Sequence, residues 1–219
     1  DLLKEFLPAK YESYEILDDK SQINFIFSRA SNLNIDQSYK SVNNVAGAYN
    51  KITDRMIKIK ELENHRDSEK IQEVIDSYEM YKQILTKEKL FDFSTIQETF
   101  LKELENTQNG LLSNVQDKFD YFFIDEYQDV SNLQAKIFFL LSSKKNNLLV
   151  VGDDDQSIYS FRGANYSNFI NFKDKFSKSK IHEKTLTGNY RSTDILVDFY
   201  NKIRPSNRRN YKTEMVSKR

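Results

Sequence analysis

Carboxylates gather directly behind an apolar run in the segment DYFFIDEYQD, at residues 120–129. Asp125 and Glu126 follow the run YFFI, and Asp129 closes the segment. An Asp at the end of a buried strand can hold Mg²⁺, because this hard cation prefers oxygen ligands and nucleotide phosphates complete its shell. The neighbouring Glu can orient and deprotonate an attacking water. The pattern therefore favours phosphoryl-transfer chemistry.

A second acidic segment, GDDDQSIYSFRGA at residues 152–164, allows several interpretations. An EF-hand calcium loop beginning at Asp153 is excluded, because its sixth position needs Gly and is Ile158. A two-metal nuclease, which requires only paired carboxylates, stays open. The residues behind the acids predict either a base-stacking platform with a cation for phosphate or ordinary core aromatics, and they are Tyr159, Phe161 and Arg162.

A third stretch whose residues could take part in catalysis is TLTGNYRST, at residues 185–193. Arg191 is a candidate to reach a γ-phosphate in the manner of an arginine finger, and Tyr190 offers an aromatic face beside it. Taken alone, this turn favours an ordinary surface arginine.

Short apolar runs are expected to position these residues. YFFI at 121–124 and NLLVV at 147–151 are typical of strands that are buried on both faces of a parallel sheet. A helix-spaced stripe lies between them and consists of Leu133, Ile137, Leu140 and Leu141. We expect residues 121–124, 148–151 and 181–186 to share one parallel sheet. Both acidic segments should then meet at one edge of that sheet, where ligands gather in open α/β folds.

The first ninety residues have a different, helical pattern. An amphipathic stripe runs along one expected helix and consists of Ile71, Val74, Ile75, Tyr78, Tyr81 and Leu85. A second stripe covers residues 96–104, with Ser94 as its expected N-cap. The whole chain has only five Gly and two Pro, so that little interrupts its helices. Residues from about 16 to 88 are therefore predicted to form a separate all-helical lobe.

Composition narrows the class of protein. Lys plus Arg and Asp plus Glu both number 33, which excludes a strongly basic nucleic-acid-binding chain but not a local basic face. The absence of Cys excludes a disulfide framework, a thiolate metal site and a cysteine nucleophile. The sequence has no apolar run of membrane-spanning length and no signal-peptide pattern at its start. A soluble cytoplasmic protein is expected.

Taken together, the three stretches carry a specific resemblance. FFIDEYQDVSNLQ, VVGDDDQSIYSFRGA and LTGNYRST, in this order and spacing, resemble motifs II, III and IV of the UvrD/Rep/PcrA family of superfamily 1 DNA helicases. KLFDFSTI resembles the segment in which such chains return from a helical insertion to the motor core. YEILDDKSQ is similar to the segment that opens the insertion. The likeness spans roughly residues 11–200.

This resemblance implies an α/β fold: part of a P-loop (RecA-like) motor core with parallel strands, plus an inserted all-helical subdomain. Residues 1–88 would be the inserted subdomain. Residues 89–183 would form the C-terminal half of the first RecA-like domain, and residues 184–219 would begin the second.

For the ATP side of the site, the resemblance implies five roles. Asp125 would bind Mg²⁺, and Glu126 would be the catalytic base. Gln156 would sense the γ-phosphate and couple it to DNA. Tyr190 would stack on adenine, and Arg191 would contact the γ-phosphate. The implied cofactors are ATP and Mg²⁺.

For the DNA side, the resemblance implies that Tyr159 and Phe161 contact or stack on bases. Arg162 would link this segment to the acidic site or to DNA. The implied activity is ATP-driven 3′ to 5′ movement on single-stranded DNA, with unwinding at single-strand/duplex junctions and no membrane partner.

The sequence also departs from the family. No Gly-Lys pair occurs in the chain, so the phosphate-cradling Walker A loop is absent. We therefore expect an internal fragment of a helicase, inactive as an ATPase by itself. The alternatives are a short paralogue that binds DNA or a partner without hydrolysis, and a metal-dependent nuclease.

Overall fold

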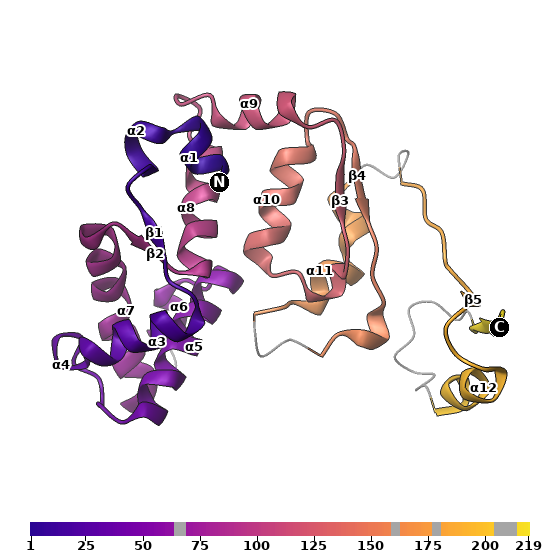
Figure 1. Ribbon diagram of the computed structural model, residues 1–219, viewed down its shortest axis with the longest axis horizontal. Coiled ribbons are helices and arrows are strands. Elements are labelled where there is room, and N and C mark those ends of the chain that lie inside the picture. Colours follow the sequence, from indigo (N-terminus) through magenta and orange to yellow (C-terminus); the bar gives the residue numbers. More distant parts are fainter. Residues whose placement is uncertain (64–68, 159–162, 177–180, 204–213) are drawn as a thin grey trace.

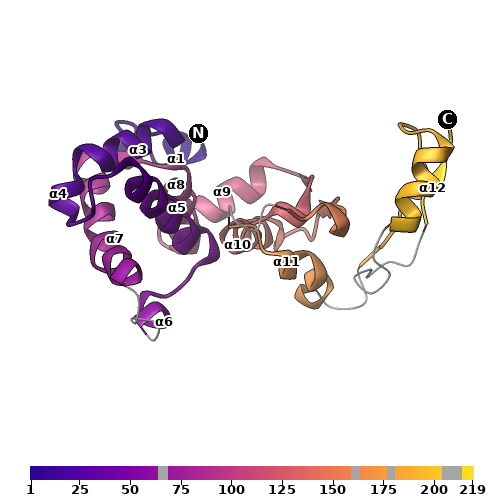
Figure 2. The same ribbon diagram turned by 90° about the horizontal axis from the view of Figure 1, so that it is seen from below.

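The computed structural model describes residues 1–219 with the exception of residues 64–68, 159–162, 177–180 and 204–213. Figures 1 and 2 show a helical region, formed by the first part of the chain, next to a smaller region in which a helix packs beside two strands. A third unit, which contains β5 and α12, lies apart from both in the two views.

The helical region forms because amphipathic helices bury their apolar stripes against one another. Ile26, Tyr49 and Tyr81 lie at the centre of its core and are at most 1% exposed. The described residues between 19 and 88 contain no strand, as the sequence predicts. The helices are α3 (Asp19–Ser28), α4 (Ala30–Leu33), α5 (Tyr39–Arg55), α6 (Ile59–Glu63) and α7 (Glu69–Glu88). The stripe expected on α7 is confirmed, since its buried members are Ile75, Tyr78, Tyr81 and Leu85.

A second core joins the start of the chain to helices that follow the helical region. Its most deeply buried members include Leu104, Leu111 and Val115, which are at most 1% exposed. Leu3 and Tyr11 pack into the same core. The contributing helices are α1 (Leu2–Phe6), α2 (Pro8–Tyr11), α8 (Phe93–Glu105), α9 (Leu111–Lys118) and α10 (Asn132–Ser142). Two short parallel strands, β1 (Glu15–Ile16) and β2 (Leu90–Phe91), connect the two cores.

The N-cap of α8 differs from the expected Ser94. Asp92 is the N-cap, because its Oδ1 accepts hydrogen bonds from the backbone N–H groups of Ser94 (2.9 Å) and Thr95 (2.6 Å). The side chain of Thr95 completes a capping box. Asp92 is only 2% exposed, and its Oδ2 also accepts from the Tyr81 hydroxyl (2.6 Å). An acid with these donors is a stronger cap than the serine two residues later.

The strand–helix–strand unit expected from the sequence is confirmed. β3 (Phe122–Ile124) and β4 (Leu148–Val150) pair in parallel, with Phe122 opposite Leu148. Between them, α10 begins in a capping box formed by Ser131 and Gln134. Its expected stripe is confirmed too, since Leu133, Ile137 and Leu141 are buried. In Figure 1, α10 runs alongside the two strands.

Two expectations about this sheet are wrong. The strands are not covered on both faces by the described residues, because Phe123 is 69% and Leu149 is 49% exposed. Residues 181–186 form no strand either, and Leu186 is 85% exposed. The run IHEKTL has charged or polar residues at four successive positions, so it presents no apolar face with which to join the sheet.

Short elements complete the chain. Behind the second acidic segment lie α11 (Tyr166–Ile170) and a 3₁₀ turn, η4 (Phe172–Lys175). Farther on, β5 (Gly188–Asn189) pairs in parallel with β6 (Val216–Ser217), and α12 (Asp194–Ile203) lies between them in sequence.

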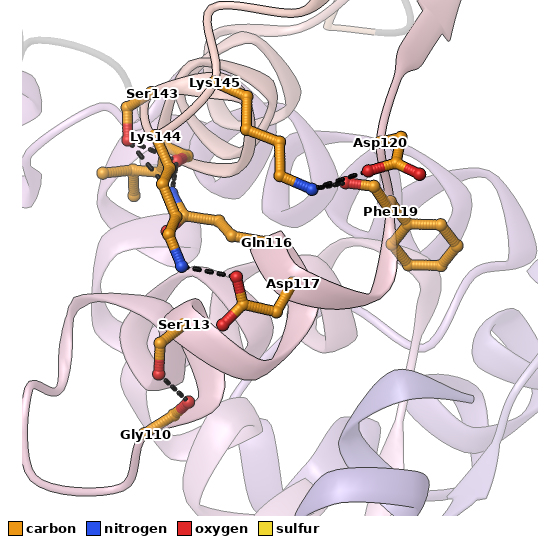
Figure 3. A network of polar contacts seen from close by, with 10 residues as sticks. Gly110, Ser113, Gln116, Asp117, Phe119, Asp120, Ser143, Lys144 and Lys145 are labelled. Atoms are coloured by element: carbon orange, nitrogen blue, oxygen red, sulfur yellow. Dashed lines mark hydrogen bonds and ion pairs between the residues drawn. The ribbon is translucent and has the colours of Figure 1, made fainter.

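Polar contacts hold together the segments that precede β3 and β4 (Figure 3). Lys145 Nζ donates to Asp120 Oδ1 (2.8 Å), and Lys144 pairs with Asp117. The buried amide of Gln116 donates to the backbone O of Leu140 (2.8 Å) and so ties α9 to the end of α10. These contacts lie at the amino ends of the strands, away from the acidic residues that follow the carboxyl ends.

Candidate nucleotide-binding site

The carboxyl ends of β3 and β4 bring the two acidic segments together, as the sequence predicts. The backbone N–H of Val151 donates to Ile124 O (2.8 Å), and that of Tyr127 donates to Val151 O (2.9 Å). These bonds continue the ladder beyond the strands. Asp125 and Glu126 therefore lie beside the segment that begins at residue 152.

Glu126 occupies a left-handed backbone conformation, with φ 50° and ψ 43°. Such a conformation costs a non-glycine residue roughly 1–3 kcal/mol and is often found at functional sites. It is followed at once by the 3₁₀ turn η1 (Tyr127–Asp129), whose Tyr127 is fully buried. Burial of Tyr127 fixes the turn, and the side chains of Asp125 and Glu126 remain exposed.

Gln128 lies at the centre of this arrangement and is 1% exposed. Its Nε2 donates to Glu126 Oε2 (2.6 Å), and its Oε1 accepts from the backbone N–H of Asp153 (3.0 Å). A Cβ placed on Gly152 would lie 2.7 Å from Gln128 Oε1. Glycine is therefore required at residue 152 by the close approach of this amide. The sequence interpretation did not assign a role to Gln128, because a Gln between two acids resembles any polar turn residue.

The second acidic segment forms its own short turn, η2 (Asp154–Gln156). Asp153 Oδ1 accepts from the backbone N–H of Asp155 (3.0 Å). Asp153 Oδ2 accepts from the Nε2 of Gln156 (2.8 Å). Gln156 is exposed and shares the strand-end edge with Asp125 and Glu126.

Asp129 is a partly buried acid at the end of this turn. Burial raises its pKa, and the negative charge of nearby Glu126 raises it further. Its Oδ1 is buried without a hydrogen-bond partner among the residues that the structure describes.

The carboxylates at this edge suit Mg²⁺ only when nucleotide phosphates supply further ligands. Within the described part of the chain, no group of three or more His, Cys, Asp or Glu side chains is arranged to hold a metal. Asp125 offers an exposed carboxylate whose Oδ1 accepts from the Glu126 backbone N–H (2.9 Å). Mg²⁺ commonly binds one or two carboxylates together with water and substrate phosphates, and Asp125 fits that mode.

The other predicted site residues are not brought to this edge. Tyr190 is 78% exposed, and Arg191 is exposed, on the unit of β5 and α12 that Figure 1 places apart from β3 and β4. No hydrogen bond or ion pair links either residue to the acidic segments within the described residues. Tyr159, Phe161 and Arg162 lie outside the residues that the structure describes.

The end of α5 meets the residues that close the second acidic segment. Gly163 has φ +95°, and a Cβ placed on it would lie 2.8 Å from the Cβ of Asp54. Arg55 Nη2 donates to the backbone O of Ala164 (3.3 Å). Burial raises the pKa of Asp54 to about 6; the charge of Asp92 acts in the same direction, and a hydrogen bond with Ser94 opposes it.

The family assignment rests on a sequence match. A family model described as the UvrD/REP helicase N-terminal domain matches residues 2–177. Because that match covers most of the sequence, the chain belongs to the UvrD/Rep helicase family.

Several curated relatives are similar to the chain over most of its length. It is 29% identical over 192 residues to the ATP-dependent DNA helicase PcrA of Leuconostoc citreum, covering 88% of this chain and 25% of that protein. It is 30% identical over 195 residues to PcrA of Staphylococcus aureus, covering 89% and 26%. It is 29% identical over 191 residues to PcrA of Staphylococcus epidermidis, covering 87% and 26%. The chain thus spans about a quarter of the length of these relatives.

No helix in the described ranges combines the length and apolar character needed to cross a membrane.

Proposed function

We propose that the chain is part of an ATP-dependent DNA helicase that moves 3′ to 5′ on single-stranded DNA and unwinds duplexes at single-strand/duplex junctions. The observation that carries this proposal is the meeting of Asp125, Glu126 and Gln156 at the carboxyl ends of two parallel strands. Family membership and the printed names of the relatives support it.

The residues at the strand ends divide the work of ATP hydrolysis. Asp125 would hold Mg²⁺, which when bound would neutralise charge that develops on the nucleotide phosphates. Glu126, exposed beside it, would accept a proton from the attacking water. Gln156 would respond to the γ-phosphate, because its amide is exposed at the same edge and held by Asp153.

The remaining site residues would act from other parts of the protein. Tyr190 and Arg191 would reach adenine and the γ-phosphate if the unit of β5 and α12 closes toward the strand ends. Tyr159, Phe161 and Arg162 would form the DNA contact. Their aromatic and cationic side chains are suited to bases and phosphates, respectively.

The domain organisation is likewise a proposal. Residues 1–88 would be largely the inserted helical subdomain, residues 89–183 the C-terminal half of the first RecA-like domain and residues 184–219 the start of the second. The separate core around Tyr49 and Tyr81 supports an independent helical unit. Leu3 and Tyr11 pack instead with α8 and α9, so we place α1 and α2 with the motor side.

An unwinding assay tests the function. The full-length protein that we propose contains this chain is incubated with Mg²⁺, ATP and a duplex that carries either a 3′ or a 5′ single-stranded tail. Unwinding of the 3′-tailed duplex alone is the expected result. Equal unwinding of both substrates would contradict the polarity, and DNA cleavage with Mg²⁺ but without nucleotide would favour the nuclease alternative.

A further inference from the structure

The orientation of the Gln128 amide is dictated by its neighbours. The backbone N–H of Asp153 can only donate, so the group that faces it at 3.0 Å must be the carbonyl oxygen of Gln128. The amide nitrogen then faces the carboxylate of Glu126 at 2.6 Å. Flipping the amide would place two donors together on one side and two acceptors together on the other. Gln128 therefore holds Glu126 in one orientation.

The same amide belongs to a longer chain of hydrogen bonds. Glu126 Oε2 accepts from Gln128, and Gln128 accepts from the backbone of Asp153. The side chain of Asp153 then accepts from Gln156 Nε2 at 2.8 Å. Of these three bonds, the one from the Asp153 N–H to Gln128 joins the segment behind β3 to the segment behind β4, and the other two each lie within one segment.

Burial makes this connection stiff. Gln128 is 1% exposed, and its Oε1 lies 2.7 Å from the position where a Cβ on Gly152 would be. Water has little access to the amide, so its bonds to the two segments have little competition. A shift of the backbone at residues 152–153 must therefore move the amide, and with it the carboxylate of Glu126.

We propose that Gln128 is a positioning residue that orients Glu126 and links it to Gln156 through Asp153. The inference deepens the proposed function and rests on it. Gln128 is buried and therefore has no exposed side-chain surface to offer to nucleotide or DNA. Its role is to hold the carboxylate in place for proton transfer and to make that orientation depend on the segment that carries Gln156.

Gln128→Glu in the full-length protein is the first test. This variant keeps the volume and the acceptor for Asp153. Burial beside Glu126 raises the pKa of the new carboxyl, so kcat is measured as a function of pH. Above that pKa the donor to Glu126 is replaced by a second carboxylate oxygen. Loss of a hydrogen bond to a charged group should lower kcat for DNA-stimulated ATP hydrolysis about 10- to 100-fold. Binding of a non-hydrolysable ATP analogue should be unchanged, because the amide does not contact the nucleotide.

Gln116→Glu is the matched control. Gln116 is another buried glutamine, whose amide donates to Leu140 O (2.8 Å) and to Ser143 Oγ (3.1 Å) away from the acidic edge (Figure 3). Its substitution should lower the melting temperature as much as Gln128→Glu does, yet leave kcat near the wild-type value at temperatures where both proteins are folded. Equal kcat in the two variants would overturn the inference.

Hydrogen exchange tests the link in the 219-residue chain itself. The Asp153 amide donates to the side chain of Gln128, so Gln128→Leu should speed its exchange, whereas Gln128→Glu and Gln116→Leu should not. Unchanged exchange in Gln128→Leu would contradict the connection. If the wild-type full-length protein hydrolyses no ATP, the proposed function fails together with the inference. An active wild type with an equally active Gln128→Glu variant overturns the inference alone.

Discussion

At the scale of single residues, several polar groups in and near the site are held in energetically unfavourable conformations or environments. Glu126 is kept in a left-handed conformation, and Asp129 has a buried oxygen without a partner among the described residues. Asp54, at the end of α5, carries a carboxyl whose burial raises its pKa to about 6. Such groups reduce stability, and their retention is easier to explain by function than by folding.

The raised pKa of Asp54 gives a pH prediction for the isolated chain. The folded protein binds this proton up to about pH 6, whereas the unfolded chain releases it near the ordinary aspartate pKa of 3.8. The folded state therefore binds more protons between these values, and the contribution of Asp54 to stability falls as pH rises through them. Asp54→Asn should be more stable than wild type above pH 6, by about 1–2 kcal/mol once partial exposure is allowed for.

Urea unfolding at pH 4 and pH 7 measures this effect. The difference between Asp54→Asn and wild type should be small at pH 4 and should grow by pH 7. Taking the difference removes the contribution of the other carboxylates. A constant difference across this range would show that Asp54 titrates normally in the folded protein.

At the scale of elements, several strands and helices could be predicted from the sequence, because the apolar residues that they bury follow a regular spacing within each short segment. The runs around β3 and β4 and the stripes on α7 and α10 consist of apolar residues at regular spacing, and the structure confirms them. The expected strand at 181–186 does not form, because the successive polar residues of IHEKTL leave it no apolar face with which to join the sheet. The role of Asp92 as a cap was missed although its capping box with Thr95 is local in sequence.

The junction between α5 and Gly163 gives a prediction with a built-in control. Gly163→Ala combines a left-handed φ of +95° with a 2.8 Å approach to the Cβ of Asp54, so it should cost more than about 1 kcal/mol of stability. Gly47→Ala, inside α5, meets nothing within 4 Å and should stabilise the chain by about 0.5–1 kcal/mol.

Thermal or urea unfolding of the two glycine variants measures these changes in stability. Opposite signs for the two substitutions are expected. If Gly163→Ala is as stable as wild type, then the close contact between α5 and the end of the second acidic segment does not exist in solution.

At the scale of the whole molecule, the candidate site is only partly assembled. The sequence correctly placed Asp125, Glu126 and Gln156 at one edge, because parallel strands deliver their carboxyl ends to the same side. Tyr190 and Arg191 belong to the unit of β5 and α12, which lies apart from that edge. The exposed Phe123 and Leu149 mark a sheet face that the described residues leave uncovered.

The isolated 219-residue chain should therefore show no meaningful ATP hydrolysis. It has no Gly-Lys pair and hence no Walker A loop to anchor the phosphates, and positioning supplies most of the catalysis in phosphoryl transfer. A phosphate-release assay with Mg²⁺, ATP and single-stranded DNA checks this. DNA-stimulated turnover by the chain alone, abolished by Glu126→Gln, would contradict it.

The most direct test of the central claim is DNA-stimulated ATP hydrolysis by the full-length protein with and without Glu126→Gln. This substitution preserves shape and removes the carboxylate that we assign as the base. The account predicts that kcat falls by at least about 100-fold, since general-base catalysis contributes 10²–10⁴-fold, while ATP binding is retained. Hydrolysis at the wild-type rate in Glu126→Gln would show that the edge formed by β3 and β4 is not the catalytic site.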